Sequence, residues 1–256
     1  MIYGKLPVSF LGAIASEKKG CTNSAVAAYM LEHLEEVQGM NIMELANACH
    51  VSSSTISRFC KEIGFDSYAE LREVLQNPEM YFERQTIAAT GRERANITAE
   101  AIMSSITMVK DSLNLNKVQK LCAEIARYKR VAAFGLLKAG AAAIDLQCNL
   151  LMLGKYIYTN ISYPQQMEYI LSSGADDLIL IFSYTGSYFE YQEHGDLDQL
   201  LQTPRIWMIS GKRKKYPPYI NDTLLFTSIH DQLGHPYQLQ TAASIIAQEY
   251  ALLQSK

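Results

Sequence analysis

Two different spacings of hydrophobic residues divide the chain into an early and a late part. In the early part, apolar residues recur every three or four positions, which is the spacing of one face of an amphipathic helix. The successive stripes are Val26, Met30, Leu34 and Val37; Ile42, Leu45, Ala46 and Cys49; Ile56, Phe59, Cys60 and Ile63; and Tyr68, Leu71, Val74 and Leu75. The pattern therefore predicts four short helices, one after another.

Polar residues and glycines mark the ends of these predicted helices. Asn41, with Glu44 three residues later, forms a capping-box pattern, in which each side chain reaches a backbone N–H left free at the helix start. Gly64, just beyond the third predicted helix, is expected to close the last turn of that helix in a left-handed conformation. The other expected caps are Asn23 or Ser24 and Ser52 at helix starts, and Gly39 beyond a helix end.

The second and third predicted helices are separated by only three residues, His50, Val51 and Ser52. Two helices joined by such a short turn form a helix-turn-helix, whose second helix enters the major groove of DNA. We expect Val51 to supply the apolar plug between the helices. His50 takes the turn position where glycine is common, and a left-handed backbone there is uncommon but tolerable for histidine.

With its apolar stripe turned inward, the third predicted helix presents its polar residues to the outside. Hydroxyls and an arginine near a helix N-terminus suit contacts with DNA phosphates and base edges. The predicted DNA-binding residues are Ser53, Ser54, Thr55, Ser57, Arg58 and Lys61. The alternative is that they are ordinary solvated residues on a small helical bundle.

From about residue 115, short apolar or β-branched runs alternate with helix-length segments. The runs are residues 131–134, 157–159, 178–182, 206–209 and 223–226, and the helical segments are residues 139–153, 164–171, 189–201 and 237–253. Short hydrophobic strands that alternate with helices are typical of a parallel sheet covered on both faces. The sequence thus predicts two domains: an all-α helix-turn-helix bundle, followed by an α/β domain with a five-stranded parallel sheet flanked by helices.

The expected boundaries are residues 1–76 for the helical domain, 77–112 for a linker and 113–256 for the α/β domain. The linker contains a polar, charged series, and one helix is expected in it from about residue 95 to 110. Residues 1–76 hold 6 Lys and Arg against 9 Asp and Glu, a balance of −3. Because DNA-binding domains are more often basic, this charge weighs against DNA binding.

The remaining composition favours an ordinary protein of the cytoplasm. The five cysteines are scattered without a CxxC pair, which fits reduced thiols better than a disulfide framework. The sequence has no run of about 18 apolar residues, and its N-terminus lacks a charged segment followed by an apolar one. We therefore expect a cytoplasmic protein with neither a membrane span nor a secretory signal.

The run from Asn41 to Leu75 closely resembles the N-terminal domain of the RpiR/MurR family of bacterial sugar-phosphate regulators. The matching residues are Glu44-Leu45-Ala46, Val51-Ser52, Thr55, Arg58-Phe59-Cys60, Gly64-Phe65 and Glu70-Leu71-Arg72. They include caps, core positions and the exposed Arg58 together. The resemblance implies a transcriptional regulator that binds DNA through its helix-turn-helix.

The ends of the predicted strands are the candidate ligand sites, because ligands of open α/β sheets bind beyond the carboxyl ends of the strands. After residues 178–182, hydroxyl side chains surround Gly186 before an expected helix, which suits a phosphate; a plain turn is the alternative. The basic run 212–215 is either a solvated loop or a contact for phosphate or DNA. Further candidates for the pocket or a dimer interface are His230, Asp231 and His235.

The late part, from about residue 115 to 253, resembles a sugar isomerase (SIS) domain, a fold that binds phosphosugars and usually dimerises. RpiR-type regulators pair these two domains in this order. The SIS pattern SxSGxTxE is matched in kind after the strand at 178–182, although Tyr188 replaces its threonine. In the loop after the first strand, Leu137 replaces the second glycine of the pattern GxGxS and Ala139 replaces its serine. The resemblance implies that the effector-binding residues are Gly135, Lys138, Ser183, Thr185, Gly186, Ser187 and Glu190.

These resemblances predict a regulator of sugar or amino-sugar metabolism, a homodimer or homotetramer that binds an operator in double-stranded DNA and responds to a phosphosugar. Catalytic residues, metal ligands and cofactors are not expected. The altered first loop supports an alternative, an effector-independent DNA-binding protein that uses a degenerate SIS domain for dimerisation. A phosphosugar isomerase is a third possibility, with Glu190 and His194 as the nearby candidates for a general base.

Overall fold

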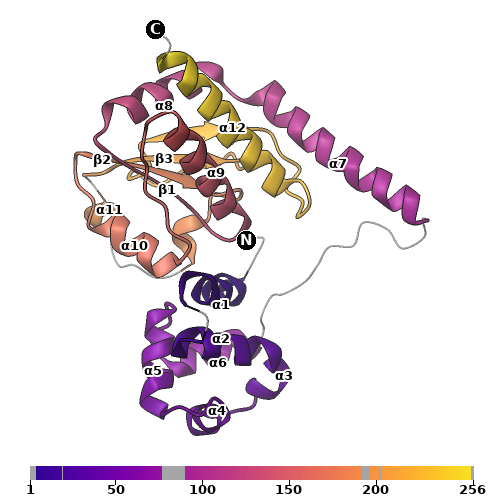
Figure 1. Ribbon diagram of the computed structural model, residues 1–256, viewed down its shortest axis with the longest axis vertical. Coiled ribbons are helices and arrows are strands. Elements are labelled where there is room, and N and C mark those ends of the chain that lie inside the picture. Colours follow the sequence, from indigo (N-terminus) through magenta and orange to yellow (C-terminus); the bar gives the residue numbers. More distant parts are fainter. Residues whose placement is uncertain (1–3, 19, 77–89, 192–196, 202, 255–256) are drawn as a thin grey trace. The chain divides into compact units, whose positions relative to one another are not determined.

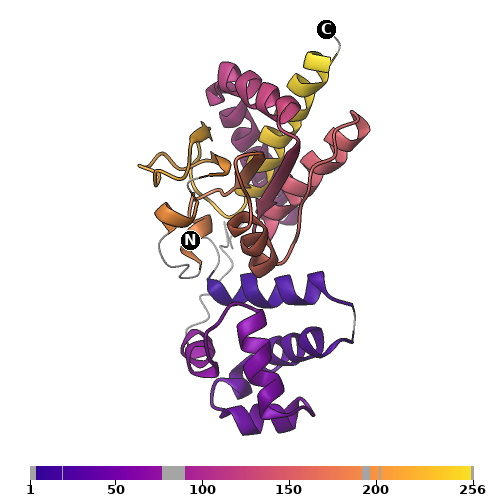
Figure 2. The same ribbon diagram turned by 90° about the vertical axis from the view of Figure 1, so that its left-hand side faces the viewer.

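A computed structural model of the chain describes residues 4–18, 20–76, 90–191, 197–201 and 203–254. The chain divides into two compact units, and Figures 1 and 2 show their elements from two directions. The first unit contains Met1–Tyr81, Asn160–Glu168 and Tyr191–Glu193, and the second contains Phe82–Thr159, Tyr169–Glu190 and His194–Lys256.

The first unit contains six helices within its described residues. They are α1 (Lys5–Ser16), α2 (Thr22–Glu32), α3 (Leu34–Val37), α4 (Ile42–Ala48), α5 (Ser53–Glu62) and α6 (Tyr68–Gln76). All six contribute to one hydrophobic core, because the apolar stripe of each helix is buried against the others. Its largest buried side chains include Phe10 and Phe59, whose rings meet edge to face with centroids 5.9 Å apart.

Three features of this unit differ from the sequence-based expectation. The helix α1 was not predicted, although Leu6, Phe10 and Ala13 are buried with helical spacing. The first predicted helix is instead two helices, because His33 leaves the helical conformation with φ −118° and ψ 35° and stacks its ring on Tyr29. Finally, α2 begins after Cys21, so neither Asn23 nor Ser24 is its N-cap.

The second unit is an α/β structure. Its described elements, in chain order, are α7 (Gly91–Ser112), α8 (Leu115–Arg127), β1 (Arg130–Gly135), α9 (Lys138–Met152), α10 (Tyr163–Leu171), β2 (Asp177–Phe182), the 3₁₀ turn η1 (Tyr188–Glu190), α11 (Leu197–Leu200), β3 (Arg205–Ser210), β4 (Asp222–Leu225) and α12 (His235–Gln254). The first six residues of α10 are grouped with the first unit. The helix α12 packs against α7, α8 and α9 (Figure 1).

The sheet is parallel throughout, in the order β1-β2-β3-β4. Every residue of β2 is buried, as expected for a central strand of a parallel sheet. The described residues form four strands, so the prediction of five was wrong. The expected strand at 157–159 is reduced to one parallel bridge between Ala132 and Tyr158, because only two hydrogen bonds join this short segment to β1.

A second correction concerns residues 189–201, which were expected to form one helix. The described part of this segment forms the three-residue η1 and the four-residue α11, and residues 192–196 lie outside the described residues. The turn after β2 therefore does not open onto a long helix. The expected anion-binding contribution from such a helix N-terminus is absent from the described segment.

Ion pairs fix the amino ends of the strands, opposite the candidate ligand site. Arg130 at the start of β1 makes two hydrogen bonds of 2.7 Å to Asp177 at the start of β2. Arg205 at the start of β3 makes two hydrogen bonds to Glu124 of α8, at 2.9 and 3.0 Å. These ion pairs hold the strands in register from their amino ends. The loops that form the candidate ligand site follow the carboxyl ends of the strands. Within the described residues, no helix is both long enough and apolar enough to cross a membrane.

Candidate functional sites

The turn between α4 and α5 is closed by two backbone hydrogen bonds. The Val51 N–H donates to the carbonyl of Ala46 at 2.9 Å, and the His50 N–H donates to the carbonyl of Asn47 at 3.1 Å. This pair of bonds is the Schellman motif, which requires a left-handed residue directly after the helix. His50 supplies it with φ 53°, as the sequence predicted, and Val51 packs against the core.

The two helices that this turn joins, α4 and α5, are both capped at their starts as predicted. Asn41 and Glu44 form a complete capping box at the start of α4. At the start of α5, the Ser52 hydroxyl accepts a hydrogen bond from the Thr55 N–H at 3.1 Å. The same hydroxyl lies 2.7 Å from that of Ser54 and 2.8 Å from that of Thr55. Three hydroxyls therefore gather at the exposed beginning of α5.

One face of α5 is buried and the opposite face is exposed. Ile56, Phe59 and Cys60 face the core, whereas most of the predicted DNA-binding residues face solvent. The exposed members are Ser54, Ser57, Arg58 and Lys61, and the half-buried members are Ser53 and Thr55. Arg58 is 65% exposed and lies 3.6 Å from Glu62, also exposed. Such a surface ion pair contributes little free energy, so it does not prevent Arg58 from binding a stronger partner.

In the second unit, the turn from β1 to α9 brings two segments of backbone close together. A Cβ atom on Gly135 would lie 2.6 Å from the carbonyl carbon of Ala139, so only glycine fits there. Leu137, the residue before α9, has φ 51° and ψ −117°. This backbone conformation is one that glycine adopts freely and that side-chain-bearing residues adopt only with strain. The turn keeps the shape that a glycine would give it, although the glycine is absent.

The turn after β2 places the predicted hydroxyl residues together, but largely out of solvent. Ser183 is 8% exposed and Ser187 is 7% exposed, while Thr185 is half-buried. Gly186 has φ 70°, a left-handed conformation, and its N–H donates to the Ser183 carbonyl at 2.9 Å. The turn itself is therefore formed as the sequence indicated, with Gly186 at its centre.

The loop after β3 lies on top of this turn. A Cβ atom on Gly186 would lie 2.5 Å from the Tyr216 hydroxyl oxygen and 2.8 Å from its Cε1 atom, so the Tyr216 ring rests on Gly186. In the same loop, the Lys214 ammonium lies 2.7 Å from a carboxylate oxygen of Glu190. Lys214, and to a smaller extent the Ser187 hydroxyl, lower the pKa of Glu190. Glu190 is thus a stable carboxylate that already has partners.

At the carboxyl end of the sheet, the structure brings Tyr184 and Ser228, which the sequence did not single out, together with His235, which it did. The Tyr184 hydroxyl is hydrogen-bonded to the Ser228 hydroxyl, and the Tyr184 ring lies 5.1 Å from that of His235, between centroids. His235 is 2% exposed, and burial lowers its pKa to about 4, with a further contribution from nearby Lys138. The sequence places Tyr184 in a turn. Its position beside the candidate site is recognised only from its contact with His235, at the start of α12.

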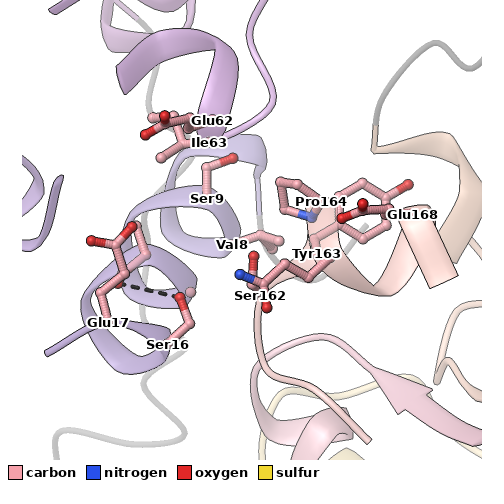
Figure 3. A pocket seen from close by; sticks show the side chains of 13 residues that line it. Val8, Ser9, Ser16, Glu17, Glu62, Ile63, Ser162, Tyr163, Pro164 and Glu168 are labelled. Carbon is pink, nitrogen blue, oxygen red and sulfur yellow. Dashed lines mark hydrogen bonds between the residues drawn. The ribbon is translucent and has the colours of Figure 1, made fainter. Parts of the chain in front are cut away.

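A cavity of about 390 Å³ lies within the first unit and is lined by 13 residues (Figure 3). Its lining includes the carboxylates of Glu17, Glu62 and Glu168, together with serine hydroxyls, and contains no lysine or arginine. Carboxylates repel an anion, so this cavity does not suit a phosphate. None of the predicted effector-binding residues lines it. Among the described residues, no group of three or more His, Cys, Asp or Glu side chains is arranged to hold a metal ion.

The family of the helical unit follows from a match between its sequence and a family model. The model of the helix-turn-helix domain of the rpiR family matches residues 9–78. These residues are a helix-turn-helix domain of the rpiR family. The prediction from the run between Asn41 and Leu75 is confirmed, and the rpiR domain begins earlier, within α1.

Curated relatives of the chain are helix-turn-helix regulators. An uncharacterized HTH-type transcriptional regulator of Providencia stuartii is 25% identical over 185 residues, which cover 70% of this chain and 65% of the relative. The HTH-type transcriptional regulator HexR of Pseudomonas aeruginosa is 25% identical over 179 residues, covering 66% of this chain and 61% of HexR. The chain thus spans less than two thirds of the length of these relatives.

Solved structures show the same fold. The NanR protein of Vibrio vulnificus, complexed with ManNAc-6P, has a TM-score of 0.52 and 16% identity, covering 98% of this chain and 92% of NanR. A protein of Escherichia coli CFT073 has a TM-score of 0.53 and 13% identity, covering 65% of this chain and 94% of that protein. The rpiR domain is therefore followed by an α/β domain whose fold these proteins share, with four described strands instead of five.

Proposed function

We propose that the chain is a DNA-binding transcriptional regulator of sugar or amino-sugar metabolism, controlled by a phosphosugar-type effector. The rpiR-family match over residues 9–78, together with the exposed polar face of α5, carries the proposal. The proposed domains are residues 1–76, 77–112 and 113–256, and the DNA partner implies a cytoplasmic location. The proposed DNA-binding residues are Ser53, Ser54, Thr55, Ser57, Arg58 and Lys61.

The proposed mechanism uses α5 as the recognition helix. Arg58 can make two hydrogen bonds to a guanine, and the hydroxyls at the start of α5 can contact phosphates. A homodimer or homotetramer presents two such helices to a pseudo-palindromic operator, whose half-sites match the two-fold symmetry of the protein. An effector changes operator affinity only if it binds one arrangement of the two helices more tightly than another.

The second unit supports an anionic effector at the carboxyl end of the sheet. The solved structure of NanR, which shares the two-domain fold, is a complex with ManNAc-6P, and this supports a phosphosugar for this chain. The proposed effector-binding residues are Gly135, Lys138, Ser183, Thr185, Gly186, Ser187 and Glu190. We propose no catalytic role, because Glu190 is already bound to Lys214, and His194, the other candidate base, lies outside the described residues.

A second candidate is a DNA-binding protein that needs no effector. Two observations favour it: Ser183 and Ser187 are buried, and the Tyr216 ring rests on Gly186. A thermal-shift screen separates the two candidates. It compares ManNAc-6P and other sugar phosphates with the corresponding free sugars. Stabilisation by one phosphorylated sugar and not by its free form contradicts the effector-independent function.

The regulator proposal is tested by selecting genomic fragments of the source organism with purified wild-type protein and with Arg58→Ala. Loss of a bidentate contact to guanine costs about 1–3 kcal/mol, so we expect a roughly tenfold to hundredfold weaker affinity for the selected sites. Arg127→Ala is the matched control, because it removes an exposed arginine from α8 in the second unit. Circular dichroism verifies that both variants are folded.

The result expected is that wild type and Arg127→Ala enrich the same fragments and Arg58→Ala does not. Equal enrichment by all three proteins contradicts the role of Arg58. If the wild-type protein enriches no fragment, with and without a sugar-phosphate mixture, the proposal of a DNA-binding regulator is wrong.

A further inference from the structure

The loop after β3 contains a segment, residues 211–219, that covers the proposed effector site; we call it the strap. Its Tyr216 ring lies directly on Gly186, the centre of the turn after β2. The left-handed conformation of Gly186, with φ 70°, leaves that side of the backbone without a Cβ atom. The open side of the glycine, where a ligand would approach the backbone, is therefore filled by a side chain of the same chain.

The strap is anchored at its start by hydrogen bonds to Tyr184, in the turn after β2. The Ser210 hydroxyl donates to the Tyr184 carbonyl at 3.1 Å, and the Gly211 N–H donates to the same carbonyl at 3.2 Å. The Tyr216 hydroxyl donates to the carbonyl of Lys212 at 2.8 Å, which closes the strap on itself. These bonds fix the start of the strap and the position of the Tyr216 hydroxyl.

A second link joins the strap to η1 and is electrostatic. The Lys214 ammonium is 2.7 Å from the Glu190 carboxylate, and the side chains are 29% and 57% exposed. The Ser187 hydroxyl contributes, after Lys214, to the lowered pKa of this carboxylate. A cation that makes a charge-assisted hydrogen bond is a strong donor to a phosphate in a protein site. Glu190 therefore occupies, with its own negative charge, the Lys214 ammonium that would suit an external anion.

We propose that Glu190 is an internal substitute for the effector anion, and that a phosphate binds here by replacing Glu190 on Lys214 and moving Tyr216 off Gly186. This inference rests on the proposed effector function and adds Lys214 and Tyr216 to its site. Lys214 is the cation that selects a phosphorylated ligand over the free sugar. The Glu190 carboxylate and the phosphate of the ligand compete for the Lys214 ammonium. Glu190 therefore lowers the affinity of this site for the phosphate.

The test measures binding of inorganic phosphate to the full-length protein by calorimetry, at constant ionic strength. Glu190→Gln removes the competing charge and keeps the shape of the side chain. Because an exposed ion pair contributes up to about 1 kcal/mol, we expect Glu190→Gln to bind phosphate about three- to fivefold more tightly than wild type. Lys214→Met should bind more weakly than wild type, and the double variant should lose the gain of Glu190→Gln.

Asp111→Asn is the control for net charge, because it removes an exposed carboxylate from α7 that is paired with Lys110. A gain in Asp111→Asn equal to that in Glu190→Gln overturns the proposal, since the effect would then be general. Unchanged or weaker binding in Glu190→Gln overturns it, and so does a lack of phosphate binding by every variant. Arg58-dependent DNA binding, measured on the same preparations, shows whether the regulator function survives that failure.

Discussion

The turn before α5 and the turn before α9 are each built around a residue with positive φ that is not glycine. His50 has φ 53° in the first, and Leu137 has φ 51° in the second. At His50 the chain follows a Schellman motif, whose left-handed region a histidine tolerates. At Leu137, ψ is −117°, and a side chain there costs about 1–3 kcal/mol of strain.

The difference separates a turn that keeps its family pattern from a turn that has lost part of it. The turn at His50 retains its hydrogen bonds, its apolar plug and the exposed face of α5. The turn at Leu137 retains only its backbone path, because Ala139 replaces the serine of the SIS pattern and Leu137 its glycine. The helix-turn-helix is therefore close to its family pattern, while the turn before α9 has diverged from the SIS pattern around a retained shape.

The largest expected effect concerns the pH dependence of stability that the buried His235 gives to the second unit. Burial lowers the pKa of His235 to about 4, against about 6.5 in an unfolded chain. His235 is therefore neutral in the folded state, and its contribution to stability is complete above pH 6.5. As the pH falls toward 4, the unfolded state takes up the proton first. We expect the free energy of unfolding to fall by about 2 kcal/mol from this residue between pH 7.5 and pH 5.

Urea unfolding of the full chain at the two pH values measures this effect. In His235→Gln the loss between pH 7.5 and pH 5 should be smaller by about that amount, whatever the absolute stability of the variant. His50→Gln is the control, because it removes an exposed imidazole and keeps His235. Equal losses in wild type and His235→Gln would show that His235 does not titrate as a buried neutral group.

The next effect concerns Leu137. Leu137→Gly relieves the strained backbone and Leu137→Ala does not, although both remove the side chain beyond Cβ. After the entropy that glycine loses on folding, about 0.5–1 kcal/mol, we expect Leu137→Gly to be about 1–2 kcal/mol more stable than Leu137→Ala. Hydrogen exchange of β1 and α9 amides, with urea unfolding of the full chain, measures the difference. A less stable glycine variant would mean that the turn is not strained.

The same two turns show what a sequence can and cannot predict. The caps at Asn41 and Ser52 and the left-handed His50 were predictable, because each depends on residues within a few positions of one another. The break in the helix at His33 was not predictable. The apolar stripe that ends at Val37 continues across this break, and the residues on both sides of it pack into the same core. Periodicity alone cannot distinguish one long helix from two that share a face.

The second unit was less predictable because its features depend on distant packing. The residues of the turn after β2 were identified from their local pattern, and whether they bind an effector stays a prediction. Tyr216 lies 30 residues after Gly186 in the chain, and no local sequence pattern predicts the contact of its ring with Gly186. The missing fifth strand has a similar cause, since pairing at a sheet edge depends on the neighbouring strand as well as on the hydrophobic run at 157–159.

The smallest expected effect concerns His50, and the turn at Gly64 in the same chain serves as the comparison. The end of α5 has the same Schellman motif, with Gly64 at φ 94° in the place of His50 and Phe65 bonded to the Cys60 carbonyl at 2.8 Å. Because glycine adopts a left-handed backbone without steric cost, His50→Gly should stabilise the helical unit by about 0.5–1 kcal/mol, and His50→Ala should not. Hydrogen exchange of α4 and α5 amides measures this gain. DNA affinity should change less than about twofold, since the turn keeps its geometry. A destabilised His50→Gly with weaker DNA binding would show instead that the imidazole itself holds the turn, and the contrast with the strained Leu137 would lose its basis.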